Sequence, residues 1–124
     1  MILGIGSDVI EIARIAKACR RYGDGFLRRV LAPSEIEFAT RLSETRLFEF
    51  VAGRFAAKEA IAKASGIGLA RLGMTSVELK TTEDGLAVRF VNHDHPLTRP
   101  GLVWHVSISH STETAFAVAV VEQV

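Results

Sequence analysis

Two lysines and a glutamate lie within an alanine-rich segment at residues 54–64, which reads RFAAKEAIAKA. Seven of these eleven residues are apolar, so the segment predicts a packed helix that nevertheless carries Lys58, Glu59 and Lys63. Glu59 and Lys63 are four residues apart and would share one helix face. A carboxylate among apolar neighbours needs a partner or a metal to offset its desolvation. The helix alone fits an ordinary surface ion pair and a functional site equally well.

A second carboxylate, Asp8, lies in the opening run MILGIGSDVIEI, which predicts a strand that continues past Asp8. Aspartate is uncommon in strands, so Asp8 either caps the helix that follows or has a functional role. Two carboxylates together with waters and phosphate oxygens suit Mg²⁺, which seldom has a cage made only of protein ligands. Asp8 and Glu59 are therefore a candidate Mg²⁺ site.

Basic residues concentrate near the N-terminus, where six of the fifteen Lys and Arg fall at positions 14–29. Such a cluster suggests an anionic partner, although it also fits an ordinary solvated helix face. These residues are Arg14, Lys17, Arg20, Arg21, Arg28 and Arg29. An alternative function of a different class is a non-catalytic binding module that uses helix 12–22 on an anionic partner such as nucleic acid. Tyr22 is the only aromatic residue of helix 12–22, which disfavours a platform for single-stranded nucleic acid.

The overall composition fits a soluble, cytoplasmic protein with one domain over residues 1–124. The net charge is +1, and the single Cys19 excludes an internal disulfide. The sequence opens without the basic segment of a signal peptide, and no apolar run approaches the ~20 residues that span a membrane.

The fold class indicated by the elements is α+β, with an N-terminal strand, about three helices and then antiparallel strands packed against a long central helix. The first helix follows the strand, with an apolar face of Ile12, Ile15, Ala16 and Cys19. Residues 26–31 are expected to form a short connector. A second helix begins at Pro33 and Ser34, where Ser34 and Glu37 have the spacing of a capping box.

The long helix is expected to end near Gly66, and a flexible loop over residues 66–73 follows it. Two hairpins complete the chain, one around Asp84-Gly85 and one around the turn SHSTET. Gly4 and Gly6 are poor strand formers, which predicts a close approach to the backbone at both.

Histidines offer one further candidate, His105, which shares a strand face with Val103, Ser107 and Ser109 in LVWHVSIS. This polar face is also what a solvated side of a sheet looks like. His93 and His95 lie in a loop beside a proline and are expected to be solvated, without chemistry.

Three segments together resemble the signatures of the 4'-phosphopantetheinyl transferases, and most closely those of the short, single-domain members. These segments are GIGSDVIEIARI at 4–15, FVAGRFAAKEAIAKA at 50–64 and WHVSISHS at 104–111. The resemblance extends along nearly the whole chain. It implies the family's fold and its reaction, the Mg²⁺-dependent transfer of the phosphopantetheine arm of coenzyme A (CoA) to a serine of an apo acyl carrier protein, with release of adenosine 3',5'-bisphosphate.

The resemblance also implies roles for residues, carried over by motif position. Asp8 and Glu59 would be the Mg²⁺ ligands, and Lys63 would contact the phosphate under attack or the pyrophosphate. Two more basic residues, Arg54 and Lys58, would lie near the CoA phosphates. His105 would contact CoA near its phosphorylated ribose.

Partners follow from the same resemblance. Short family members are homotrimers with CoA in clefts between subunits. Acyl carrier proteins are acidic, so the basic residues near the N-terminus gain a candidate partner. The docking residues would be Arg14, Lys17, Arg21 and Arg28, with Arg20 beside them. Independently of the resemblance, the loop after the long helix could bring Arg71 or backbone N–H groups to the nucleotide.

Three points stay open. Either Glu59 or a metal-bound water would take the serine proton. A Mg²⁺-dependent phosphohydrolase would share the metal site and would release phosphopantetheine without a carrier. Many relatives carry a proline shortly after the glycine of the first hairpin, whereas Leu86 and Ala87 follow Gly85 here, so the adenine pocket would have a different wall.

Overall fold

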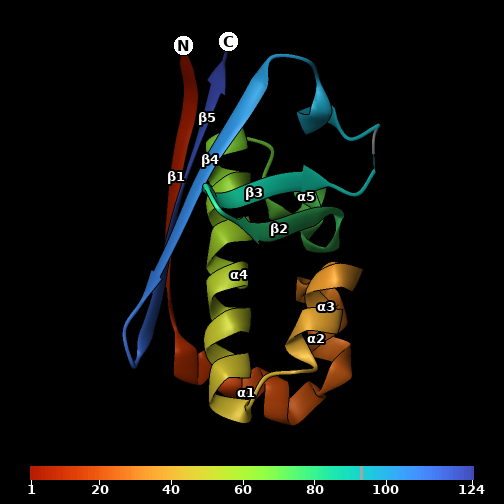
Figure 1. Cartoon of the computed structure of the whole chain (residues 1–124), viewed down its shortest axis with the longest axis vertical. Helices are drawn as coiled ribbons and strands as arrows, with labels where there is room; N and C mark the ends of the chain where they lie inside the picture. The colour runs from red at the N-terminus through yellow and green to blue at the C-terminus, as the bar shows by residue number, and fades with distance from the viewer. Residues whose placement is uncertain (93) are drawn as a thin grey trace.

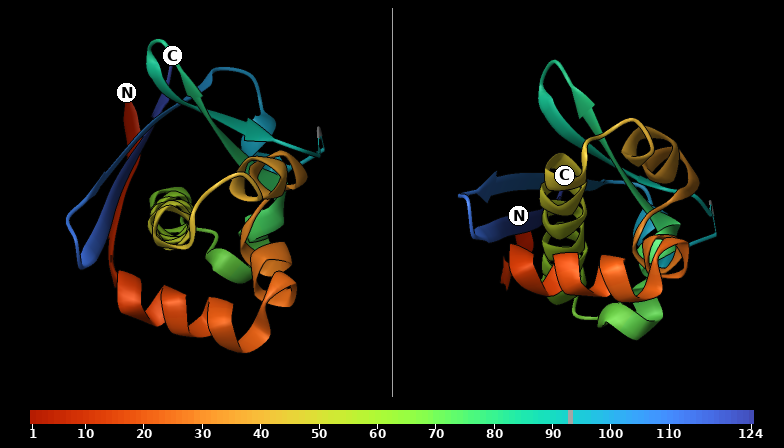
Figure 2. Two further views of the ribbon diagram at one scale, coloured as in Figure 1. Left: turned by 60° about the horizontal axis from the view of Figure 1, so that its bottom comes forward. Right: turned by 90° about the horizontal axis from the view of Figure 1, so that it is seen from below.

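One long helix, α4 (Glu44–Ser65), lies at the centre of the computed structural model, which describes residues 1–92 and 94–124. The other elements surround α4, as the end-on view of Figure 2 (left) shows. The helix begins at Ser43, whose hydroxyl accepts a hydrogen bond from the Arg46 N–H. It ends at Gly66, which has the left-handed φ of 76° that favours glycine. The predicted long helix and its end are therefore confirmed.

A three-stranded antiparallel sheet covers one side of α4 (Figure 1). Its strand order is β1–β5–β4, formed by β1 (Ile2–Glu11), β5 (Thr114–Gln123) and β4 (Leu102–His110). Strand β1 runs straight past Asp8, as the sequence predicts. Side chains alternate, so that Ile10, Ala115, Ala117 and Ala119 are buried on the face toward α4. The opposite face of the sheet, which we call the outer face, is partly exposed.

Three short helices lead from β1 into α4. The first, α1 (Ile12–Tyr22), buries Ile12, Ile15 and Ala16 as predicted. Residues 26–31, expected to form a connector, instead belong largely to α2 (Asp24–Val30). The prediction was wrong because Gly23 and Gly25 obscure a helix whose partly buried Phe26 and Leu27 pack on the core.

The next helix, α3 (Pro33–Ala39), begins as predicted but is capped by different residues. Ala32 is its N-cap, and Glu35, not Glu37, accepts the hydrogen bond from the Ala32 N–H at 2.8 Å. The expected box of Ser34 and Glu37 is thus wrong by two residues. Glu35 is buried and Glu37 is exposed, so the helix turns Glu35 toward the interior.

After α4, the chain forms one helical turn, α5 (Leu69–Leu72), and a 3-10 turn at Met74–Ser76 within and beyond the predicted loop. The predicted first hairpin is confirmed as β2 (Val77–Thr82) and β3 (Gly85–Phe90), which form a separate two-stranded sheet across α4. A second 3-10 turn covers Pro96–Thr98 and leads to the confirmed hairpin of β4 and β5.

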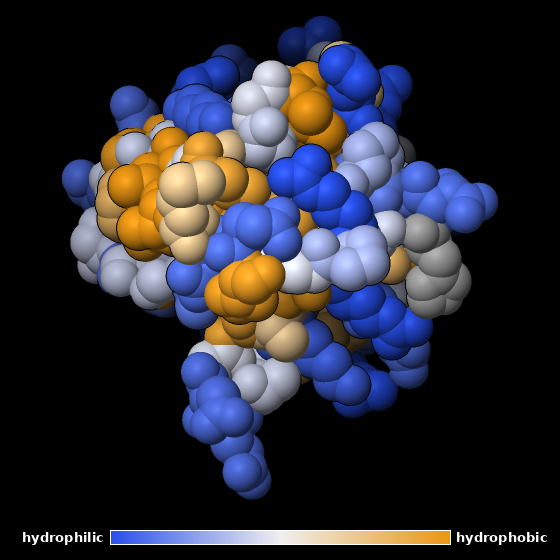
Figure 3. Space-filling view, turned by 90° about the horizontal axis from the view of Figure 1, so that it is seen from above, coloured by the Kyte–Doolittle hydropathy of each residue, from blue (hydrophilic) through white to orange (hydrophobic). Residues whose placement is uncertain are grey.

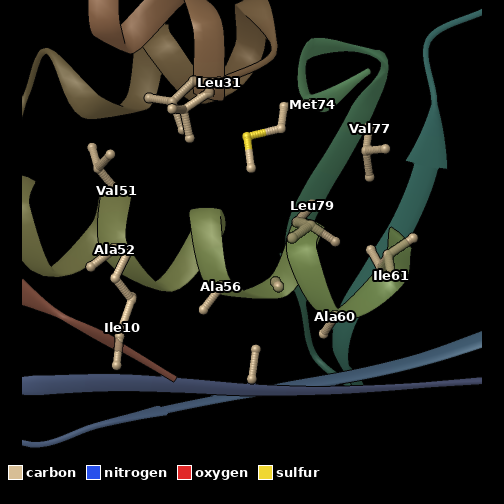
Figure 4. Close-up of a cluster of buried hydrophobic side chains, with 14 of the residues drawn as sticks. Ile10, Leu31, Val51, Ala52, Ala56, Ala60, Ile61, Met74, Val77 and Leu79 are labelled. Atoms are coloured by element: carbon tan, nitrogen blue, oxygen red, sulfur yellow. The ribbon is translucent and has the colours of Figure 1, made fainter. Parts of the chain in front are cut away.

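Small and branched side chains fill the core between these layers (Figure 4). Ala52, Ala56 and Ala60 of α4 are fully buried against the sheet, while Leu31 and Val77 pack from the other side. His95 is buried as well, 3.1 Å from the Leu72 carbonyl oxygen, which corrects its expected solvation. His93 lies outside the described residues.

Apolar residues also gather on the surface at the end where both termini lie, as the view from above shows (Figure 3). The exposed large apolar side chains at this end are Met1, Ile2, Leu3 and Val124. Among the described residues, no helix combines the length and the apolar character that crossing a membrane requires.

Candidate active site

The close contact between β1 and α4 positions the candidate catalytic residues. A Cβ atom at Gly6 would clash with the Ala60 carbonyl oxygen, and one at Gly4 with the Ala64 carbonyl oxygen. Only glycine lets the helix backbone lie directly on the strand at these points. The close approach predicted at both glycines is confirmed, and it brings the helix turn that carries Glu59 and Lys63 beside Asp8.

Lys63 connects the helix to the strand. Its amine donates a hydrogen bond to the Ser7 carbonyl oxygen at 2.9 Å and lies 3.3 Å from Asp8 Oδ1. β1 is an edge strand, so its free edge leaves room for this side chain. The Lys63 side chain is 54% exposed and that of Asp8 is 19% exposed, so a ligand in solvent has access to both.

Glu59 is electrostatically coupled to the other two residues. Partial burial raises the pKa of its carboxyl above the ordinary value, the charge of Asp8 raises it further, and Lys63 opposes the change. The two carboxylates therefore repel each other across a partly open site. A divalent cation would relieve this repulsion, so the donor set fits Mg²⁺. No third metal-ligating residue joins them among the described residues, which leaves coordination positions for water and phosphate oxygens.

Lys58, the residue before Glu59, has a different environment from the one predicted. Its side chain is fully buried, and its amine donates hydrogen bonds to Glu35 Oε1 at 2.5 Å and to the Val30 carbonyl oxygen at 2.7 Å. Burial lowers the pKa of Lys58, while Glu35 opposes that shift. Because the amine is enclosed, the structure offers CoA phosphates no access to it.

Arg54 lies on the same side of α4 as Lys58. Its Nε is 3.7 Å from Glu35 Oε2 and has no hydrogen-bond partner among the described atoms, and its guanidinium lies 4.6 Å from the centre of the Phe50 ring. Arg54 lines a pocket of about 290 Å³ between α3, α4 and β2. It also lines a second pocket of about 190 Å³ that contains Arg46 and His110. An anion in either pocket would meet its positive charge.

His105 is exposed on the outer face of the sheet, as the alternation predicts. Its Nε2 lies 2.9 Å from Glu122 Oε1 on β5. Asp8 belongs to the opposite face, with Gly6 and the buried Ile10. One copy of the chain therefore brings together Asp8, Glu59 and Lys63 but leaves Arg54 and His105 on other sides of the molecule.

The basic residues near the N-terminus form an exposed surface, which we call the basic surface. Its members are Arg14, Lys17, Arg20 and Arg21 on α1 and Arg28 and Arg29 on α2. Arg20 is held by Glu44 at 3.2 Å and lies over the Phe48 ring. The surface thus lies beside the N-terminal end of α4.

Comparison with known proteins identifies the family. A profile of the 4'-phosphopantetheinyl transferase superfamily matches residues 4–121. This chain belongs to that superfamily. A holo-[acyl-carrier-protein] synthase of Bacillus cytotoxicus is 43% identical to this chain over 123 residues. The match covers 98% of this chain and 97% of that protein.

Solved structures agree with the assignment to the superfamily. A holo-(acyl-carrier-protein) synthase of Bacillus anthracis in complex with CoA (3',5'-ADP) has a TM-score of 0.84 and 40% identity, covering 100% of this chain and 99% of that one. A Helicobacter pylori holo-[acyl-carrier-protein] synthase in complex with coenzyme A has a TM-score of 0.79 and 30% identity, with coverage of 95% and 99%. The predicted α+β family fold is confirmed.

Two residues that contact the predicted site residues were missed from the sequence. Glu35 holds Lys58 and Arg54, and Glu122 holds His105. Glu122 has a visible signal, because it is the only charged residue in the strand TAFAVAVVEQ. Glu35 has no such signal in the sequence beyond its place three residues after the N-cap, because its partners Lys58 and Leu79 are distant in sequence.

Proposed function

We propose that this protein transfers the phosphopantetheine arm of CoA to a serine hydroxyl of an apo acyl carrier protein and releases adenosine 3',5'-bisphosphate. The observation that carries the proposal is the convergence of Asp8, Glu59 and Lys63 at the free edge of β1. This convergence occurs in a chain that is similar over its whole length to CoA-bound synthases.

Phosphoryl transfer depends mainly on positioning and on neutralising charge, and the site supplies groups for both. Asp8 and Glu59 would hold Mg²⁺, which would supply electrostatic stabilisation at the pyrophosphate oxygens. Lys63 would place its ammonium where charge develops on the leaving phosphate. Its hydrogen bond to the Ser7 carbonyl fixes the amine in advance, so little reorganisation is needed on binding.

The serine hydroxyl must lose its proton during the transfer. Glu59 is one acceptor, and its raised pKa makes it a better base than an ordinary carboxylate. Water at the exposed side of the site is the other. Both assignments require Glu59 itself, either as base or as ligand.

The remaining predicted CoA contacts require more than one copy of the chain. Arg54 would contact CoA phosphates and His105 the phosphorylated ribose, yet neither lies beside Asp8 in one chain. A homotrimer with CoA in clefts between subunits would unite them. The outer face supports such an assembly, since Ile5, Val9 and Phe116 are 65%, 63% and 40% exposed there. Lys58 is assigned a structural role because its amine is enclosed.

The basic surface would dock the carrier protein. Acyl carrier proteins are acidic, and Arg14, Lys17, Arg21 and Arg28 are exposed together with few acidic neighbours. Charge complementarity of this kind chiefly accelerates association. We therefore expect the transfer rate at low carrier concentration to fall as salt rises.

The proposal is tested by intact-protein mass spectrometry of a panel of apo carriers incubated with CoA, Mg²⁺ and this protein. We expect the mass of at least one carrier to increase by one phosphopantetheine. Unchanged masses across the panel would contradict the transferase. Free phosphopantetheine released without any carrier would instead favour a phosphohydrolase that uses the same site.

The trimer has its own test in light scattering. We expect the wild type to have the mass of three chains and Val9→Asp, which places a charge on the apolar outer face, to dissociate and lose transfer. The matched variant Glu113→Gln changes an exposed turn residue and should keep both properties. A wild-type monomer that transfers normally would contradict the assembly.

A further inference from the structure

The pair formed by His105 and Glu122 is unusual for its surroundings. Glu122 is the only charged residue of β5, and the strand positions on its side of the outer face are mainly apolar, including Val118 and Val120. In the register of β4 and β5, Glu122 lies opposite Val103, and His105 lies opposite Val120. Glu122 is therefore a diagonal neighbour of His105 on the adjacent strand. This diagonal separation is within reach of long side chains. The strand register thus places the only carboxylate of β5 within hydrogen-bond distance of the histidine.

The geometry determines which ring nitrogen is left for a ligand. An ionised carboxylate only accepts hydrogen bonds. In this pair Nε2 of His105 therefore carries the hydrogen and donates a hydrogen bond of 2.9 Å to Glu122 Oε1. Nδ1 is the nitrogen that remains. The His105 side chain is 59% exposed and that of Glu122 is 32% exposed, so the ring has an open side while its partner is the more enclosed of the two.

A phosphate group likewise only accepts hydrogen bonds at full ionisation. For His105 to contact a phosphate through Nδ1, the ring must carry a proton on both nitrogens and hence a positive charge. Glu122 compensates that charge from the opposite side of the ring. A hydroxyl, in contrast, can donate to an unprotonated Nδ1 and has no need of the compensating carboxylate.

We propose that Glu122 is a positioning residue that acts through His105 and makes the protein select CoA, which carries a 3'-phosphate, over 3'-dephospho-CoA. This inference rests on the proposed function, in which His105 contacts the phosphorylated ribose. The carboxylate fixes the ring orientation and balances the charge that phosphate binding requires. Removing it weakens the contact with the 3'-phosphate and leaves the reacting pyrophosphate untouched.

The test compares CoA with 3'-dephospho-CoA in the carrier assay, using wild type, Glu122→Ala, Glu122→Gln and His105→Asn. We expect Glu122→Ala to raise KM for CoA about tenfold, as for the loss of a hydrogen bond to a charged group, with kcat within about twofold. KM for 3'-dephospho-CoA should stay within about twofold. Glu122→Gln, which keeps a hydrogen-bonding side chain but not its charge, should lie between.

Two further measurements separate positioning from a general structural role. In the His105→Asn background, Glu122→Ala should add no further loss of selectivity, because its effect passes through the ring. Nitrogen-15 spectra of His105 should show a proton fixed on Nε2 in the wild type and a mixture of tautomers in Glu122→Ala. The control Glu113→Gln removes a carboxylate from the far end of the same hairpin and should change neither readout.

The outcomes separate this inference from the function on which it rests. If the wild type is active and Glu122→Ala prefers CoA over 3'-dephospho-CoA to the same degree, the inference is overturned and the proposed function is not. Equal losses with both substrates would also overturn it, since they indicate damage to the fold. No modified carrier with either substrate in the wild type would overturn the proposed function and the selectivity with it.

Discussion

Lys58 and Glu59 are adjacent on α4 but belong to two different environments. Lys58 is fully buried, and its partner Glu35 has both oxygens occupied, because Ala32 N–H and Lys58 donate to one and Leu79 N–H to the other. Glu59 is only partly buried and lies near the like charge of Asp8. We call these the closed side and the open side of α4. One residue step turns the helix by about 100°, enough to separate the buried ion pair of Lys58 and Glu35 from a site with excess negative charge.

The difference shows how one helix serves stability and chemistry at once. On the closed side, Glu35 joins α3, α4 and β2, so losing one member leaves another charge buried without its partner. On the open side, the two carboxylates repel each other and gain from a bound cation. Substitutions on the closed side should therefore chiefly lower the stability of the fold. Substitutions on the open side should chiefly lower the rate of transfer.

Glu59→Gln is expected to have the largest effect. It removes one of two carboxylates at the reaction centre, so transfer should fall at least about 1,000-fold. The midpoint of thermal unfolding should stay the same or rise, because the coupled charge is gone. Initial rates and calorimetry measure the two properties. Full activity, or a clearly less stable variant, would contradict the assignment of Glu59 to the open side.

Lys58→Met tests the closed side. We expect the free energy of unfolding to fall by about 3–5 kcal/mol in urea titrations, since Glu35 keeps its charge without its main partner. The double variant Lys58→Met with Glu35→Gln should recover part of this loss, because the remaining amide needs no counter-charge. A loss below about 1 kcal/mol in the single variant would show that the network contributes little.

Gly6→Ala acts on the contact that brings the open side to β1. The added Cβ meets the Ala60 carbonyl, so stability should fall by about 1–3 kcal/mol and transfer should fall with it. Gly25→Ala is the matched control: its Cβ would meet nothing within 4 Å, in the helix α2. That control should gain about 0.5–1 kcal/mol. Equal effects at the two glycines would refute the close-packing explanation.

The pH dependence of stability should show the smallest effect. Folding raises the pKa of Glu59, so between its ordinary value and the raised one the folded chain binds more protons than the unfolded chain. The contribution of Glu59 to the stability of the fold therefore becomes less favourable as pH rises through this window. Relative to Glu59→Gln, the wild type should be equally stable at acid pH and less stable by under about 1 kcal/mol at neutral pH. The opposite sign in pH-dependent denaturation would contradict the raised pKa of Glu59, which burial and the charge of Asp8 cause.

Local patterns predicted much of the fold. The apolar periodicity of α1, the glycine that ends α4 and the turn residues of both hairpins each depend on neighbours in sequence, and each prediction is confirmed. The helix α2 was missed because its two glycines outweigh its few apolar residues. The cap of α3 was misplaced because Glu35 is held by Lys58, which is 23 residues away.

Contacts between distant segments explain what was missed at the candidate site. The grouping of Asp8 with Glu59 was a hypothesis from residue chemistry, and the structure brings both to Lys63. The family resemblance implied that Arg54 and Lys58 lie near the CoA phosphates. It could not show that Glu35 draws both residues to the closed side, nor that Glu122 meets His105 on the outer face.

The most direct test of the two-sided helix measures transfer to an apo carrier by mass spectrometry for variants at positions 58 and 59. Each variant is assayed below its own unfolding temperature. We expect the Lys58→Met and Glu35→Gln double variant to transfer phosphopantetheine within about tenfold of the wild-type rate, because neither residue touches the substrate. Glu59→Gln should leave the carrier mass unchanged. Rapid transfer by Glu59→Gln, or none by the folded double variant, would contradict the account.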